Sequence, residues 1–156
     1  MIRSTLLATT TLILGLPAFA DGITVHDAYM RISSPVAKSG AAFMTIENTS
    51  GEADRLVGVS STIAERTELH THQADANGMM EMLHVPEGFA IPAHGAHALA
   101  RGSDHVMFMG LTEPLEEGEH IQLTLDFEHA APVTVDLQVT MGEGPTGQSH
   151  GSMSHN

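Results

Sequence analysis

The sequence predicts an all-β protein, a single antiparallel sandwich or barrel, on three observations. Two segments near the C-terminal end, IQLTLDF (121–127) and VTVDLQV (133–139), alternate apolar and polar residues over their whole length. Such alternation is typical of antiparallel strands that bury one face. Short apolar runs elsewhere are separated by Gly, Pro, Asn and Asp, and no segment keeps a helical period. About seven to nine short strands are therefore expected, packed face to face or closed on themselves.

The expected strands follow one another in order, each bounded by residues that favour turns. A loop with Pro and Gly separates the first two, a Ser-Gly turn follows the second, and a turn at 73–78 contains Asn-Gly. The segment 86–96 holds two prolines and two glycines, so we expect it to be irregular. We expect the strands, in chain order, at residues 23–32, 41–48, 55–61, 64–72, 79–85, 97–103, 104–111, 121–127 and 133–139.

Residues 1–20 have the pattern of a secretory signal peptide that is cleaved after Ala20. Arg3 supplies the basic start, an apolar run (6–16) follows, and Ala-Phe-Ala ends the segment. The apolar run is too short to span a bilayer. We therefore expect an exported, periplasmic protein whose mature chain does not insert into the membrane.

After the signal peptide we expect one domain, residues 21–141, and a flexible tail, residues 142–156. The tail, GEGPTGQSHGSMSHN, is rich in Gly, Ser and His and has no apolar pattern. It brings His150, Met153 and His155 close together in sequence. The tail therefore carries a small cluster of side chains that could bind a metal.

Charge and cysteine content exclude several classes of function. The chain has 19 Asp and Glu against 6 Lys and Arg, a net charge of −13, which disfavours binding to nucleic acid or to an anionic membrane surface. It contains no cysteine, which removes disulfides, thiolate nucleophiles and thiolate metal ligands. A cationic ligand fits this composition better.

Histidine and methionine are frequent, with 11 and 10 residues, and they concentrate in the segments ELHTH, GMMEMLH and DHVMFM. In the last, His105, Met107 and Met109 share one face of the expected strand, while Val106 and Phe108 share the core face. Imidazole and thioether together suit Cu(I), a soft ion, whereas blue-copper electron transfer would need a cysteine. The methionines assigned to the core are Met30, Met44 and Met141.

These segments resemble the signature H-x10-M-x21-H-x-M of periplasmic copper chaperones of the PCu(A)C type, which deliver Cu(I) toward cytochrome c oxidase assembly. The matching residues are His70, Met82, His105 and Met107. The similarity extends through AYMRISSPVAKSGAAFMTIEN, IPAHG and GLTEPLEEGE, so it covers nearly the whole expected domain.

The spacing departs from the signature by one residue in each of the two long gaps. Eleven residues separate His70 from Met82, and 22 separate Met82 from His105. A strict count from His70 falls on Glu81, but an inserted residue in a turn leaves the strand faces unchanged, so we prefer Met82. Two neighbouring side chains stay open as ligands: Met80 and His72. Met109 is assigned to packing.

The resemblance implies a cupredoxin-like antiparallel β-sandwich that binds Cu(I) through two histidines and two methionines at an exposed site. It also implies partners: the copper-bearing subunit of cytochrome c oxidase, with its binuclear copper A site or a related centre, and Sco-type copper proteins. Similar tails in some members are proposed to bind a second copper, as Cu(II), which here would involve His150, Met153 and His155. A solvated tail is the alternative.

Three functions compete on these observations. The main hypothesis is a carrier that delivers Cu(I), without enzymatic activity. The alternative is a periplasmic copper storage or resistance protein with the same ligands and no dedicated oxidase target. The third is a copper-dependent redox enzyme, which the sequence favours least because two His and two Met ligands close the coordination shell against a substrate.

Overall fold

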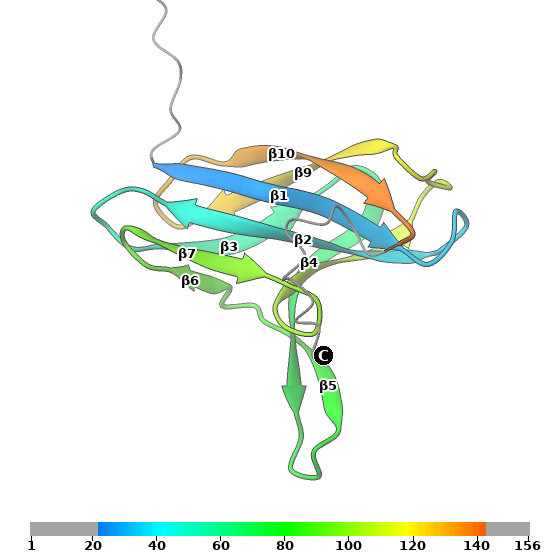
Figure 1. Cartoon of the computed structure of the whole chain (residues 1–156), viewed down its shortest axis with the longest axis horizontal. Helices are drawn as coiled ribbons and strands as arrows, with labels where there is room; N and C mark the ends of the chain where they lie inside the picture. Colours follow the sequence, from blue (N-terminus) through cyan, green and yellow to red (C-terminus); the bar gives the residue numbers. More distant parts are fainter. Residues whose placement is uncertain (1–21, 143–156) are drawn as a thin grey trace, which may run out of the picture.

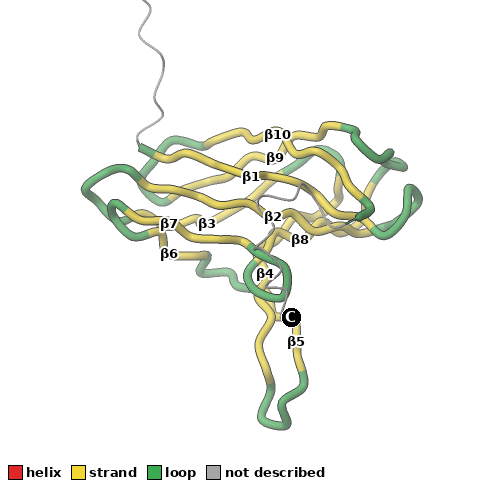
Figure 2. The backbone as a smooth tube through the Cα atoms, viewed as in Figure 1, coloured by secondary structure: helices red, strands yellow, loops and turns green. Residues whose placement is uncertain are grey.

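The computed structural model describes residues 22–142; residues 1–21 and 143–156, which hold the expected signal peptide and His150, Met153 and His155 of the tail, lie outside the described part. The described residues form ten strands and no helix (Figures 1 and 2), which confirms the all-β prediction. None of them belongs to a helix that could cross a membrane. The strands are β1 (Ile23–Ile32), β2 (Ser39–Asn48), β3 (Asp54–Ser60), β4 (Ala64–Ala74), β5 (Met80–His84), β6 (Phe89–Ile91), β7 (Gly95–Leu99), β8 (His105–Leu111), β9 (His120–Phe127) and β10 (Val133–Thr140).

The ten strands join one sheet in the order β5-β4-β8-β2-β1-β10-β9-β3-β6, and β7 also pairs with β2. Every pairing is antiparallel except that of β1 with β10, where Tyr29 lies opposite Gln138. The sheet bends so that distant strands meet, and the Thr67 hydroxyl of β4 donates a hydrogen bond to the Val59 carbonyl of β3 at 3.0 Å. The predicted antiparallel sandwich is thus present as an open, bent sheet. Its one parallel pair joins the first and last strands, which no hairpin connects.

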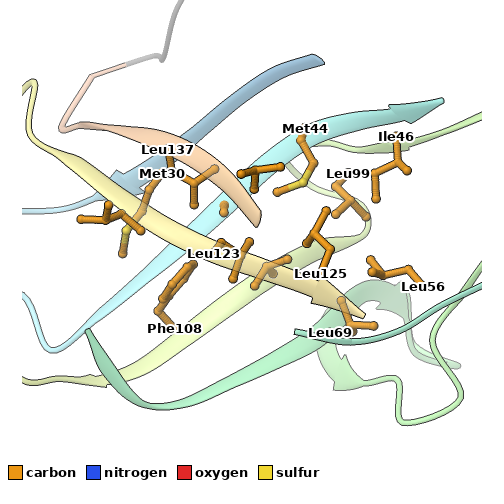
Figure 3. Packing of buried hydrophobic residues seen from close by; sticks show 14 of the residues in the cluster. Met30, Met44, Ile46, Leu56, Leu69, Leu99, Phe108, Leu123, Leu125 and Leu137 are labelled. Atoms are coloured by element: carbon orange, nitrogen blue, oxygen red, sulfur yellow. The ribbon is translucent and has the colours of Figure 1, made fainter. Parts of the chain in front are cut away.

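The core fills the space between the two layers of the bent sheet (Figure 3). Val106 and Phe108 of β8 are fully buried, as the alternation predicts, and buried and outward residues alternate along β9 and β10. Met30 and Met44 belong to this core, and Met141 packs against it. Because β8 gives one face to the core, its other face is free for a site.

Residues 86–99 hold more regular structure than the sequence indicates. Phe89 and Ile91 of β6 are buried against β3, and β7 begins before the expected strand 97–103. A three-residue strand is too short to show an alternation pattern, which is why it escaped the prediction. Gly88 precedes β6 with a φ of 73°, and a Cβ there would lie 1.9 Å from the Leu56 carbonyl oxygen.

The β4–β5 hairpin (residues 70–84) projects from the body of the sandwich (Figures 1 and 2). Its turn is held by the Asp75 carboxylate, which accepts hydrogen bonds from the backbone N–H groups of Asn77 at 2.8 Å and Met79 at 2.9 Å. Such Asx turns are a common way to close a hairpin tip. Every residue of β5 is exposed, so the hairpin carries its side chains away from the core.

Candidate metal centre

Three adjacent strands present the predicted metal-binding side chains on one face of the sheet. β4 lies between β5 and β8, and His70 of β4 is paired with His84 on one side and with His105 on the other. Directly paired residues of antiparallel strands point to the same side. Three imidazoles therefore lie in a row across the sheet, with ring centres 5.8 Å apart for His70 and His84 and 5.9 Å apart for His70 and His105.

The neighbouring pairs along β4 add the two thioethers to the same face. His72 is paired with Met82 of β5, and Glu68 is paired with Met107 of β8. Both pairs lie two residues from His70 along β4, so they share its face. The structure thus brings together on one face all four residues that match the signature: His70, Met82, His105 and Met107.

A cavity of about 330 Å³ opens on this face between the hairpin and the body. Parts of β1 and β2, including Phe43, and the turn before β8 form the rest of its wall. His70 is not among the residues that line it, although His72 is. The imidazole and thioether side chains that line the cavity are His72, Met82, His105 and Met107.

The wall of this cavity is cationic, although the chain as a whole is acidic. Arg31 and Arg101 line it, and no Asp or Glu does, whereas the net charge of the chain is −13. Arg31 is held by a hydrogen bond from its Nε to the Gly142 carbonyl at 3.0 Å. Nearby positive charge penalises a doubly charged ion more than a singly charged one.

His105 is buried, with 2% of its surface exposed, and is therefore less open than the exposed site that the resemblance implies. Phe43 and His72 cover its ring, with ring centres at 6.3 Å and 5.0 Å. Its Nδ1 lies 2.9 Å from the Ser103 carbonyl oxygen and donates to it, which leaves the Nε2 lone pair available. Burial lowers the pKa of His105 despite that hydrogen bond, so the ring is mostly neutral at pH 7 and can act as a ligand.

Glu68 fixes the tautomer of His70. The Nε2 of His70 lies 3.0 Å from Oε2 of Glu68, and this hydrogen bond is the main reason why the pKa of Glu68 is lowered. An ionised carboxylate only accepts hydrogen bonds, so Nε2 carries the proton and Nδ1 keeps its lone pair. Arg66 approaches the other carboxylate oxygen at 3.4 Å. This arrangement resembles the carboxylate–histidine pairs that orient metal ligands.

Two imidazole nitrogens of β4 are buried without a hydrogen-bond partner among residues 22–142: Nδ1 of His70 and Nδ1 of His72. Burying a polar atom without a partner costs about 1–3 kcal/mol. A bound cation would satisfy the lone pair on Nδ1 of His70, and that on Nδ1 of His72 in its Nε2–H tautomer, so the residues present fit a metal ion. Within the described part of the chain no three His, Asp or Glu side chains are placed to hold a metal ion. The thioethers of Met82 and Met107, on the same face, are the further donors available there.

The other predicted residues lie at the edge of this arrangement or outside it. Met80 is paired with Ala74 toward the hairpin tip, is 61% exposed and does not line the cavity. Met109 does not line the cavity either, and its sulfur lies 3.4 Å from Nη2 of Arg66.

His72, which the sequence left open as a ligand, lines the cavity, and so do Arg31 and Arg101, which the sequence did not single out. A signal for His72 was present in the sequence. In the signature, the segment x10-M-x21 separates the first histidine from the second. Counting this spacing back from His105 places the first histidine at His72, not at His70. No sequence signal marked Arg31 or Arg101, because each reaches the cavity from a different part of the chain.

Comparison with solved structures shows where this fold recurs. The copper-bound PCuAC domain from PmoF2 superposes with a TM-score of 0.63 at 23% identity, covering 81% of this chain and 96% of that one. DR1885 from Deinococcus radiodurans is similar in its apo form (TM-score 0.61, 30% identity, 91% and 94% covered). Its Cu(I) form is also similar (TM-score 0.63, 34% identity, 81% and 84% covered). The fold is therefore similar to that of PCuAC domains.

Comparison of sequences identifies the family. The "Putative lipoprotein Lxx21020" of Leifsonia xyli subsp. xyli is 37% identical over 123 residues, which are 76% of this chain and 71% of that protein. The sequence profile described as "Putative lipoprotein LpqE-like" matches residues 23–139, a span that includes every strand except the last residue of β10. The chain therefore belongs to the LpqE-like family.

Proposed function

We propose that this protein is an exported copper carrier, not an enzyme, that binds Cu(I) with His70, Met82, His105 and Met107. The observation that carries the proposal is the gathering of imidazole nitrogens and thioether sulfurs from three strands on one face beside a cavity. The Cu(I) form of DR1885, 34% identical to this chain, supports the choice of ion. The lipoprotein description of the family supports export.

The chemistry of this donor set suits a carrier. Thioether and neutral imidazole lose no proton on binding, and they prefer the soft, singly charged Cu(I). The cationic wall formed by Arg31 and Arg101 acts in the same direction. Met82 is 43% exposed on the hairpin, whereas His105 is buried on the body, so an incoming ligand can replace the hairpin donor first. The ion is then passed on without release into water.

We further propose that the carrier works in the periplasm and delivers copper to the copper-bearing subunit of cytochrome c oxidase, or to Sco-type proteins that serve it. The acidic surface favours encounter with a basic patch on such a partner. A deletion strain tests the recipient. Loss of oxidase activity at low copper supports delivery, whereas copper sensitivity alone favours the storage or resistance protein.

Titration of the protein with Cu(I) against a competing chelator tests the ligand set. Wild-type protein should bind more tightly than about 1 μM, and a Met82→Ala/Met107→Ala double variant should lose most of that affinity. The matched control is Met80→Ala/Met109→Ala, which removes two thioethers that do not line the cavity. Weaker wild-type binding, or equal loss in both double variants, contradicts the proposal.

A second copper, as Cu(II), would involve His150, Met153 and His155, which lie outside the described residues. The test compares the full chain with a chain that ends at residue 141. A second equivalent of Cu(II) bound only by the full chain supports this site. Equal stoichiometry in the two chains contradicts it.

A further inference from the structure

We propose that His72 is a second β4 ligand for copper, interchangeable with His70, so that either imidazole completes the set with Met82, His105 and Met107. This inference rests on the proposed copper binding and gives His72, which the sequence left open, a role beside that of His70. It implies that the ion has two positions on β4, one nearer the body and one nearer the hairpin tip.

The first support is the position of the cavity. His72 lines it together with Met82, His105 and Met107, whereas His70 does not. His72 is also the residue directly paired with Met82, and paired side chains point to the same side of the sheet. The one imidazole of β4 that faces the cavity is therefore His72.

The second support is that two buried imidazole nitrogens have no hydrogen-bond partner in the described part of the chain. Nδ1 of His70 and Nδ1 of His72 are both buried without a hydrogen-bond partner among residues 22–142. A single position for the ion near His70 would leave the nitrogen of His72 unsatisfied. If the two imidazoles bind the ion in turn, one nitrogen is unsatisfied in either state, so the two states differ little in this cost and the ion can exchange between them.

The third support is distance. In a tetrahedral site with metal–nitrogen bonds of about 2 Å, the centres of two bound imidazole rings lie roughly 5 Å apart. The ring centre of His105 lies 5.0 Å from that of His72 and 5.9 Å from that of His70. The rings of His72 and His105 are inclined by 25° and stack on each other, so binding of one ion by both requires rotation of an imidazole about Cβ–Cγ, which is a soft torsion.

The two imidazoles differ in how they are held, which gives the exchange a direction. The Nε2 of His70 is hydrogen-bonded to Glu68 near the body of the sandwich. His72 lies two residues closer to the hairpin tip, where it is paired with the half-exposed Met82. Exchange of His70 for His72 as the ligand moves the ion toward the hairpin tip, where the side chains are more exposed to solvent. His105 and Met107 on β8 keep hold of the ion during this exchange.

A double-mutant cycle on the full chain tests the proposal with Cu(I) and a competing chelator as the probe. We expect His70→Leu and His72→Leu each to lower the affinity by no more than about tenfold, because the other imidazole takes over. The double variant should lose at least about 100-fold, more than the two single losses combined. X-ray absorption should report two nitrogens and two sulfurs in each single variant and one nitrogen in the double variant.

The control is His84→Leu, which removes the other imidazole beside His70 and does not itself line the cavity. Its affinity should equal that of the wild type, and thermal unfolding of each apo variant confirms that the fold is kept. Full loss of affinity in His70→Leu, or no effect of His72→Leu in either background, overturns the role of His72 and leaves the proposed function standing. Failure of wild-type protein to bind Cu(I) overturns the proposed function itself.

Discussion

At the scale of single residues, His70 and His105 each have one of their two ring nitrogens engaged in a hydrogen bond. The Ser103 carbonyl occupies Nδ1 of His105, and Glu68 occupies Nε2 of His70. These contacts hold the rings so that the remaining lone pairs point away from those partners. The geometry of the site therefore depends on groups that would not touch the ion.

Replacing Glu68 by Gln should weaken Cu(I) binding by about tenfold or more, since loss of an outer partner of a ligating histidine typically costs 10- to 100-fold. Gln is neutral and can present an N–H to His70, so the tautomer is no longer fixed. Competition with a chelator measures the change. Glu65→Gln, an exposed carboxylate of the same strand, is the control and should bind like the wild type. Equal affinity in the two variants contradicts this role of Glu68.

Replacing Arg101 by Gln should lower the reduction potential of bound copper. Arg101 lines the cavity, and its positive charge disfavours Cu(II) more than Cu(I), so its removal stabilises the oxidised ion. Voltammetry of the copper-loaded protein measures the shift. Arg101→Lys keeps the charge and should stay near the wild-type potential, and an upward shift in Arg101→Gln would contradict the electrostatic argument.

At the scale of elements, β8 separates two tasks on its two faces. Phe108 is fully buried in the core, and Met107 lines the cavity on the other side. We expect Phe108→Ala to lower the free energy of unfolding of the apo protein by about 3–5 kcal/mol. Met107→Ala should change stability far less while weakening Cu(I) binding. Chemical denaturation and Cu(I) competition on both variants test whether one face of β8 serves stability and the other serves copper binding. A large loss of stability in Met107→Ala would show that the cavity face also stabilises the fold.

The glycine before β6 is required by a close approach of the backbone. Gly88→Ala places a Cβ 1.9 Å from the Leu56 carbonyl at a φ of 73°, whereas Gly102→Ala, at a φ of 79°, meets open space. Gly102→Ala should cost about 1–2 kcal/mol for the left-handed conformation alone. Gly88→Ala should cost clearly more, because β3 or β6 must also move. Denaturation midpoints of the two variants measure the difference, and equal midpoints would mean that the contact is easily relieved.

At the scale of the whole molecule, Asp54 joins β3 to the turn that precedes β10. Its carboxylate accepts hydrogen bonds from the backbone N–H groups of Arg55 at 2.7 Å, His129 at 3.0 Å and Ala130 at 2.9 Å. Burial acts to raise the pKa of Asp54, but these donors outweigh it and the pKa is lowered. The charged form of Asp54 therefore stabilises the folded state.

The sign of this shift predicts the acid response of the fold. The contribution of Asp54 is complete above the unfolded pKa of about 4 and is lost as the pH falls from there through the folded pKa. Asp54→Asn should therefore be less stable than the wild type at pH 7, and the gap should narrow below about pH 4. Denaturation curves at several pH values test this. A gap that is constant with pH would mean that the charge of Asp54 contributes nothing.

The alternation along single strands, together with the turn residues between them, was sufficient to predict the all-β class and most of the strands. It placed β9, β10 and the two faces of β8 correctly, because burial of one face of a strand leaves a two-residue period in the sequence. It could not find β6, which is too short to repeat, or the parallel pairing of β1 with β10, because pairing between strands at opposite ends of the chain leaves no local signal.

The sequence by itself determined the composition and the pattern: a cysteine-free, acidic β-protein whose His and Met residues share strand faces and whose spacing differs from a copper signature by one residue in each long gap. Only the tertiary structure decided which imidazole of β4 faces the cavity, which nitrogens stay unsatisfied and which cations line the wall. The physical reason is register. His70 and His72 cannot be distinguished from the sequence of β4, because both lie on the same face of the strand. They differ in the residues paired with them on β5 and β8.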